Sequence, residues 1–203
     1  MPPNELQPAF PAFLQHGGVP MEYVVNASST GARQVDHGRV NMTLQKLVIH
    51  VKADDNLIKL QCRNSETPAL CIQCIKSDPG APQADKVGIA TIVINCLRSH
   101  SRTLASNTTK LASREDDEKL RSAYQSCSKG FVKAIKYLLK VVSLLKIGDY
   151  DKANSGVMSA LKYELSCGAT FEESKWKLPG LVVHEMRVYE ALSEAAFRII
   201  DRF

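Results

Sequence analysis

The sequence lacks any long uninterrupted apolar run. Its longest candidate, 87–97, is interrupted by Gly88, Thr91 and Asn95, whereas a membrane-spanning helix needs about 18 apolar residues or more. Residues 1–18 also lack the basic start and the apolar stretch of about 7–15 residues that mark a secretory signal peptide. The sequence therefore predicts no membrane partner, and it shows no visible signal peptide.

Motifs of catalysis and cofactor binding are absent as well. The GxSxG, Walker and dinucleotide-binding glycine motifs do not occur. The histidines are scattered, and His184 begins no HExxH motif because Val188 stands four residues later. The five histidines are His16, His37, His50, His100 and His184. We therefore expect no enzyme activity, no catalytic residue, no metal site and no cofactor.

Charge of one sign does not gather into a run along the sequence. There are 26 Lys and Arg against 21 Asp and Glu, a net charge of +5, with six Phe and one Trp. Nucleic-acid-binding proteins usually concentrate basic residues on one face and interleave aromatic ones, so we expect no nucleic-acid partner. A mildly basic surface suits an acidic protein or an acidic polysaccharide matrix equally well.

Cysteine is present in a modest, even number. The six cysteines are Cys62, Cys71, Cys74, Cys96, Cys127 and Cys167. An even count suits two or three disulfide bonds. A redox CxxC motif would follow a strand, and a zinc site would need two further ligands at close spacing. Residues 71–74 form a CxxC with neither feature, so structural disulfides are favoured over redox or metal chemistry.

The chain divides into two parts of different character. Residues 1–53 contain Gly17-Gly18 and five prolines without a helical period, and we expect a mostly disordered N-terminal arm there. The remainder, 54–203, contains apolar residues at helical spacing and no sustained strand alternation. The expected helices cover 57–62, capped by Asp55-Asn56, and 69–76, 84–112, 116–147, 150–173 and 181–201.

These helices predict an all-α fold. The two short helices form a hairpin within 54–80, and the four long ones form an up-and-down four-helix bundle within 84–203. The clearest amphipathic pattern runs through 116–147, from Leu120 to Leu145 at spacings of three and four. In the helix at 150–173 the expected inner residues are Ala153, Val157, Leu161 and Leu165.

Several short motifs, in order, resemble the plant invertase and pectin methylesterase inhibitor domain. The first half of the resemblance is a cysteine pair enclosing Thr67-Pro68 and Leu70, followed by Ser77-Asp78-Pro79. The second half comprises 124–127, 148–154, 158–160 and 166–172, which read YQSC, GDYDKAN, MSA and SCGATFE. The resemblance covers about residues 55–203, roughly three quarters of the chain.

The resemblance implies a fold and a function. It implies that the hairpin is disulfide-linked by Cys62–Cys71 and that a second bridge joins Cys127 to Cys167. Cys74 and Cys96 remain as thiols or as a third bridge. Proteins of this family block a plant cell-wall or vacuolar enzyme in a one-to-one complex, which implies an extracellular, apoplastic location although no signal peptide is visible.

The target enzyme is indicated by small differences within the family pattern. Invertase inhibitors tend to carry Pro-Lys-Phe where this chain has Tyr150-Asp151-Lys152. Pectin methylesterase inhibitors tend to have the Gly-Asp-Tyr form and a Thr before the last cysteine, where Ser166 keeps the hydroxyl. The favoured partner is a pectin methylesterase, with Tyr150, Asp151, Lys152 and Ser166 as expected contacts. The alternatives are an acid invertase inhibitor and a non-inhibitory helical interaction module with reduced cysteines.

Overall fold

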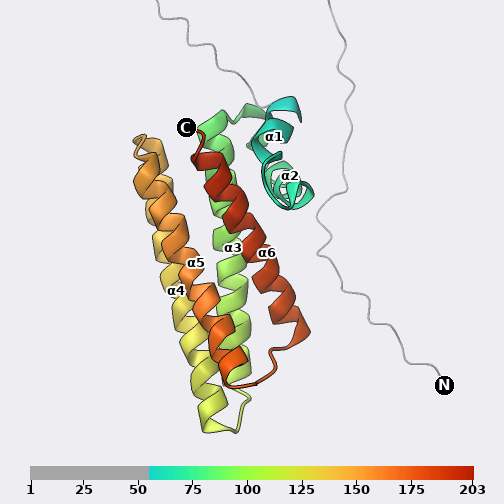
Figure 1. Cartoon of the computed structure of the whole chain (residues 1–203), viewed down its shortest axis with the longest axis vertical. Helices are drawn as coiled ribbons and strands as arrows, with labels where there is room; N and C mark the ends of the chain where they lie inside the picture. Colours follow the sequence, from blue (N-terminus) through green and yellow to red (C-terminus); the bar gives the residue numbers. More distant parts are fainter. Residues whose placement is uncertain (1–54) are drawn as a thin grey trace, which may run out of the picture. The chain divides into compact units, whose positions relative to one another are not determined.

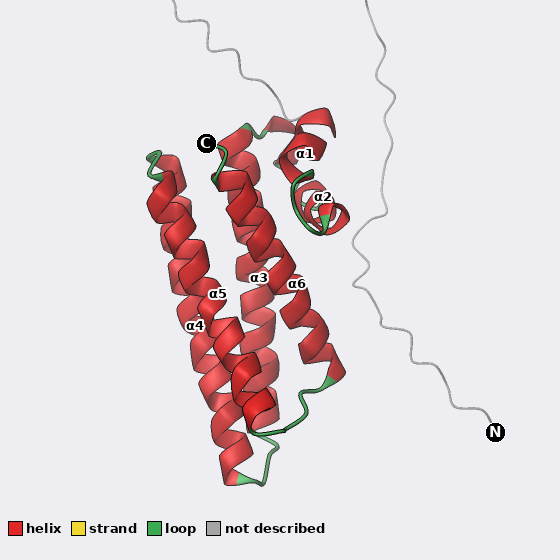
Figure 2. Ribbon diagram, in the orientation of Figure 1, coloured by secondary structure: helices red, strands yellow, loops and turns green. Residues whose placement is uncertain are grey.

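The computed structural model describes residues 55–203, and the arm expected at 1–53 lies outside them. The described residues form six α-helices and one 3-10 turn, with no strand among them (Figure 2). The elements are α1 (Asp55–Cys62), α2 (Pro68–Lys76), η1 (Ala81–Gln83), α3 (Lys86–Ala112), α4 (Glu118–Lys146), α5 (Tyr150–Glu173) and α6 (Gly180–Ile200). The all-α prediction is confirmed.

The four long helices lie side by side as an up-and-down bundle (Figure 1). Helix α3 packs against α4 and α6, and α5 packs against the same two helices. The α1–α2 hairpin packs against α3 and α6, so it lies on the side of the bundle away from α4 and α5. The predicted order of hairpin and bundle is therefore confirmed.

Aspartate caps set the starts of three of the long helices. The carboxylates of Asp85, Asp117 and Asp149 each accept a hydrogen bond from the backbone N–H three residues later. Such a cap satisfies a donor that has no partner within the helix. Because Asp85 and Asp117 are the caps, α3 and α4 begin two residues after the predicted starts at 84 and 116.

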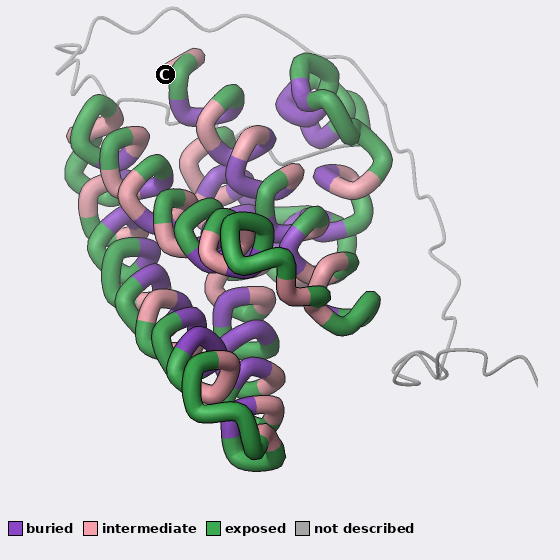
Figure 3. Tube along the Cα trace, turned by 60° about the horizontal axis from the view of Figure 1, so that its bottom comes forward, coloured by how far each residue is buried: buried purple, intermediate pink, exposed green. Residues whose placement is uncertain are grey.

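The core is made of the inward faces of the four long helices (Figure 3). The stripe predicted for α4 is buried from Tyr124 to Leu145. The stripe predicted for α5 is wrong beyond Val157, because Leu165 is 49% exposed and Leu161 is only partly buried. Spacings of four alone drift around a helix of 3.6 residues per turn. The observed stripe alternates four and three, through Ala153, Val157, Ala160, Glu164, Cys167 and Phe171.

Three disulfides join the elements. Cys62–Cys71 closes the α1–α2 hairpin and Cys127–Cys167 joins α4 to α5, with Cα–Cα distances of 5.7 and 5.1 Å. Both implied bridges are confirmed. The pair left open, Cys74 and Cys96, forms a third bridge from α2 to α3. The CxxC at 71–74 is therefore divided between two disulfides.

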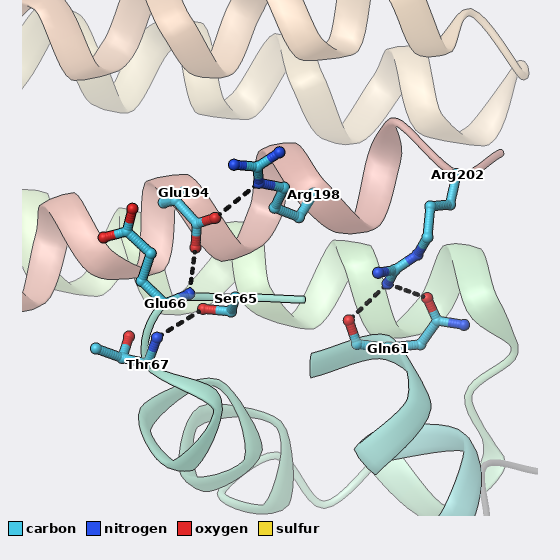
Figure 4. A network of polar contacts seen from close by, with 7 residues as sticks. All are labelled: Gln61, Ser65, Glu66, Thr67, Glu194, Arg198 and Arg202. Carbon is cyan, nitrogen blue, oxygen red and sulfur yellow. Dashed lines mark hydrogen bonds and ion pairs between the residues drawn. The ribbon is translucent and has the colours of Figure 1, made fainter. Parts of the chain in front are cut away.

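Polar contacts also fix the hairpin to the end of the bundle (Figure 4). The guanidinium of Arg202 donates to the backbone carbonyl and the side-chain oxygen of Gln61, at 2.5 and 2.9 Å. The backbone N–H of Glu66 donates to Glu194, which also accepts from Arg198. The turn between α1 and α2 is thus held directly against α6.

Candidate functional site

The most distinctive exposed feature of the described residues is a furrow between α4 and α5, which run side by side on the face away from the hairpin (Figure 1). It consists of two hollows, and we call both together the α4–α5 furrow. One hollow is lined by Tyr137, Lys140, Leu144, Lys152, Ser155, Gly156 and Ser159. The other is lined by Ser126, Cys127, Lys129, Gly130, Lys133, Tyr163, Ser166, Cys167 and Thr170.

The α4 side of the furrow carries a stripe of lysines. Lys129, Lys133, Lys136 and Lys140 are all exposed. They follow one another at spacings of four, three and four, which places them on one face of the helix. Residues 122–148 contain no aspartate or glutamate. The stripe, which we call the lysine stripe, therefore has no carboxylate beside it on α4, whose one acidic residue is Glu118 in the first turn.

Two tyrosines meet across the furrow. Tyr137 comes from α4 and Tyr163 from α5, and their ring centroids are 6.1 Å apart. The ammonium of Lys133 lies 6.0 Å from the Tyr163 ring centroid, within the range of a cation–π contact. Loss of solvent raises the pKa of Tyr163, and its neighbour Tyr137 raises it further. The tyrosine pair divides the furrow into its two hollows.

The α5 side of the furrow is lined by small hydroxyl side chains. Ser159, Ser166 and Thr170 each donate a hydrogen bond to the carbonyl oxygen four residues earlier, at 2.7–2.8 Å. With their protons used in this way, the oxygens of these hydroxyls still have lone pairs available to accept hydrogen bonds. Gly156 lines the same hollow as Ser159 and lets the helices approach closely, because an added Cβ would lie 2.6 Å from Val141 Cγ2.

The four expected contact residues fall into two places. Lys152 and Ser166 both line the α4–α5 furrow, one in each hollow. Tyr150 and Asp151 instead line a separate hollow at the C-terminal end of the bundle, where the Tyr150 ring packs against Phe203 with centroids 5.0 Å apart. The structure therefore brings Lys152 and Ser166 onto one surface and leaves Tyr150 and Asp151 beside its end.

Lys152 is oriented by the cap of its own helix. Its ammonium lies 2.7 Å from a carboxylate oxygen of Asp149. This hydrogen bond holds the pKa of Asp149 below its ordinary value and raises the pKa of Lys152. Because Lys152 is exposed and Asp149 is only partly buried, the pair contributes little to stability, and its main effect is to fix where the charge lies.

The lysine stripe and the tyrosine pair were missed in the sequence. The relevant signals were the spacing of 129, 133, 136 and 140 and the absence of acidic residues over 122–148. Lysines separated by three or four residues form no run in the sequence, yet a helix places them on one face. The pairing of Tyr137 with Tyr163 depends on the register of α4 against α5, which the sequence alone does not give.

No described helix is both long and apolar enough to cross a membrane. Within residues 55–203, no group of three His, Cys, Asp or Glu side chains is placed to hold a metal ion. A further hollow at the α3–α4 turn is lined by both signs of charge, including Glu115, Asp116 and Arg121. It therefore has no clear charge preference, unlike the α4–α5 furrow.

The described residues define a disulfide-bonded helical bundle that presents a basic furrow on a rigid face. Residues 56–199, more than half of the chain, match the family model described as plant invertase/pectin methylesterase inhibitor. The chain belongs to this family, so the resemblance noted in the sequence is confirmed.

Individual relatives and a solved structure agree with this placement. The chain is 29% identical over 122 residues to a pectinesterase inhibitor of Actinidia deliciosa, covering 60% of this chain and 66% of that protein, just under two thirds. It is 27% identical to cell wall / vacuolar inhibitor of fructosidase 2 of Arabidopsis thaliana, covering 59% of this chain and 67% of that protein. The crystal structure of mutant form A of a pectin methylesterase inhibitor from Arabidopsis shares the fold, with a TM-score of 0.61 and 17% identity. That match covers 71% of this chain and 95% of the solved chain.

Proposed function

We propose that this protein is an inhibitor of a plant pectin methylesterase and has no enzymatic activity of its own. The observation that carries the proposal is the match of residues 56–199 to the inhibitor family. The similarity to the Actinidia deliciosa pectinesterase inhibitor supports it, as does Tyr150 after Gly148-Asp149, where invertase inhibitors tend to carry Pro-Lys-Phe. The inhibitor domain is residues 54–203.

The α4–α5 face has the properties that an inhibitory surface needs. The Cys127–Cys167 bridge joins the two helices covalently. The absence of a side chain at Gly156 lets Val141 of α4 pack closely against α5. A surface ordered before binding loses little conformational entropy when it docks. We propose that Lys152 and Ser166 contact the enzyme in a one-to-one complex and that Tyr150 and Asp151 extend the contact.

The proposed location is the plant cell wall or another extracellular space. All six cysteines are joined in disulfides, and such bonds persist in oxidising compartments. The name of the Arabidopsis thaliana relative places that protein in the cell wall or vacuole. The three disulfides also disfavour the alternative of a non-inhibitory interaction module with reduced cysteines.

Inhibition of an acid invertase is the second candidate. It is favoured by the similarity to the inhibitor of fructosidase. Because the sequence departs from Pro-Lys-Phe at 150–152, we rank it below pectin methylesterase.

A parallel titration tests the proposal. The full-length, oxidised chain is added to a plant pectin methylesterase and to an acid invertase at acidic pH, and residual activity is measured against molar ratio. We expect stoichiometric loss of methylesterase activity with the invertase unaffected. Loss of invertase activity instead would favour the second candidate, and no effect on either enzyme would exclude inhibition of both classes.

A charge reversal tests the docking face. We expect Lys152→Glu to weaken inhibition about tenfold, because it places a repulsive charge in the contact. Lys110→Glu makes the same charge change on an exposed residue of α3 that does not line the furrow, and should leave inhibition within about twofold. Equal loss in both variants would contradict docking through the furrow.

A further inference from the structure

We propose that the α4–α5 furrow also binds a linear polyuronate, the carboxylate-bearing polysaccharide left when pectin methyl esters are hydrolysed. The choice of a uronate as the polyanion rests on the proposed function, while the presence of a polyanion site rests on the furrow itself. This ligand would occupy the surface that contains Lys152 and Ser166 and would compete with the enzyme for it.

The α4 side of the furrow carries charge of one sign over residues 122–148, whereas Lys152 at the end of the α5 side is paired with Asp149. Four lysines of α4 lie on one face, from Lys129 to Lys140, or about 16.5 Å for 11 steps of 1.5 Å each. On the α5 side, the one acidic residue within 152–171 is Glu164, whose side chain is buried in the core. The whole chain carries a net charge of only +5, so this face holds a local concentration of positive charge.

A polymer with one carboxylate on each sugar matches this arrangement. Successive lysines on the stripe are about 4.5–6 Å apart along the helix axis, so a chain lying along α4 meets a new ammonium every one or two sugars. Single contacts between exposed charges are weak. Several of them in a row add up, and the sum decreases as salt screens the charges.

The rest of the furrow suits a sugar chain. The tyrosine pair presents aromatic ring surface, to which the C–H face of a sugar packs. The oxygens of Ser159, Ser166 and Thr170 can accept hydrogen bonds from sugar hydroxyls.

The consequence is a feedback on inhibition. Hydrolysis of a methyl ester consumes water and releases methanol and a proton, and it leaves a carboxylate where a neutral ester stood. The enzyme's own product therefore gains the charge that the lysine stripe attracts. Accumulated product would displace the inhibitor from the enzyme, so that inhibition weakens where de-esterification has already advanced.

Direct binding tests the site without any enzyme. The full-length oxidised chain is titrated with de-esterified decagalacturonate by calorimetry at low salt and pH about 5.5, where uronates are ionised. The comparators are the fully methyl-esterified decamer and an oligothymidylate of equal charge. We expect affinity for the galacturonate to exceed that for either comparator by about tenfold or more.

Matched variants locate the binding surface. K129Q/K133Q/K140Q removes three charges from the furrow and should weaken galacturonate binding about tenfold. K59Q/K110Q/K177Q removes three exposed charges elsewhere and should change it by no more than about twofold. Unchanged thermal melting shows that both variants are folded.

Several outcomes would overturn the inference. Equal binding of the methyl ester would exclude carboxylate recognition, and equal binding of oligothymidylate would show a general polyanion surface. Equal weakening by the two triple variants would place the site elsewhere. A chain that inhibits methylesterase without binding galacturonate refutes this inference alone, whereas one that binds galacturonate and inhibits neither enzyme refutes the proposed function and the feedback.

Discussion

Glu164 is the residue whose environment differs most from that expected of its type. Its side chain is 5% exposed on the inner face of α5, and its Oε2 atom has no hydrogen-bond partner. Burial, with a further contribution from the negative charge of Glu190, raises its pKa to about 7. The hydroxyl of Tyr189 is buried as well, close enough to Ser101 and Glu164 for both to influence its pKa. The centre of the bundle therefore favours the neutral, protonated form of Glu164.

This carboxyl makes the stability of the fold depend on pH. Below the ordinary glutamate pKa of about 4.5, Glu164 is protonated whether the chain is folded or unfolded. Between about 4.5 and about 7, the unfolded chain releases this proton and the folded chain keeps it. Stability therefore falls as pH rises through this window, by up to about 3 kcal/mol from this group.

We expect Glu164→Gln to remove most of that loss, because the amide does not ionise. Urea unfolding at pH 4.5, 6 and 7.5 measures the effect, with Glu173→Gln, an exposed carboxylate on the same helix, as the control. The wild type and the control should lose stability across this range, and Glu164→Gln should lose much less. Parallel pH profiles for all three chains would contradict the assigned pKa.

At the scale of helices, the approach of α5 to α4 depends on Gly156. An alanine Cβ there would lie 2.6 Å from Cγ2 of Val141, a buried, β-branched side chain with little rotamer freedom. Gly180, at the start of α6, has no atom within 4 Å of an added Cβ. The two glycines therefore offer a matched pair of alanine substitutions.

We expect Gly156→Ala to destabilise the bundle by about 1–2 kcal/mol, since the clash exceeds the helix-propensity gain of alanine over glycine. Gly180→Ala should be neutral or slightly stabilising. Denaturant unfolding of the two variants measures the difference. Equal stability of both would mean that α4 and α5 separate at little cost, which would also weaken the argument for a preformed furrow.

Much of the fold could be predicted at this scale. The buried stripe of α4 follows from hydrophobic periodicity. The ends of the helices follow from Asp, Pro and Gly residues. Gly148, for example, adopts a φ of 77° just after the last residue of α4. The α5 stripe was misassigned because its inner face is built from small residues and a glutamate. A search for apolar spacing selects Leu161 and Leu165 as core positions. In the structure Leu161 is only partly buried and Leu165 is exposed.

The candidate site could be predicted only in part. The family pattern marks positions 152 and 166, and the structure places Lys152 and Ser166 in the furrow; their contact with an enzyme stays a prediction. The lysine stripe was visible in the spacing but was not recognised as one face. The contact between Tyr137 and Tyr163 arises from the tertiary register of two helices, and no local pattern encodes it.

For the molecule as a whole, the Cys74–Cys96 disulfide links the hairpin to the bundle. It joins α2 to α3, and its two cysteines are separated by 22 positions in the sequence. By the loop-closure estimate, such a bridge stabilises the folded chain by about 3 kcal/mol. The α1–α2 hairpin is too small to hold its place by its own core, so we expect this bridge to govern its docking.

We expect Cys74→Ala/Cys96→Ala to lower the free energy of unfolding by about 3 kcal/mol. Urea unfolding measures the change, and thiol counting in denaturant without reductant should find no free thiol in either the wild type or the variant. Free thiols in the wild type would contradict the three bridges. An unchanged stability would show that the contacts of Gln61 with Arg202 and of Glu66 with Glu194 suffice to hold the hairpin.

The order of the three bridges along the chain has a consequence for how the protein is made. The cysteines pair two by two in sequence order: Cys62 with Cys71, Cys74 with Cys96, and Cys127 with Cys167. A chain that enters an oxidising compartment N-terminus first, at about 5–20 residues per second during synthesis, delivers each native pair before the next cysteine emerges. Correct pairing then follows the order of emergence, and maturation needs little help from a disulfide isomerase.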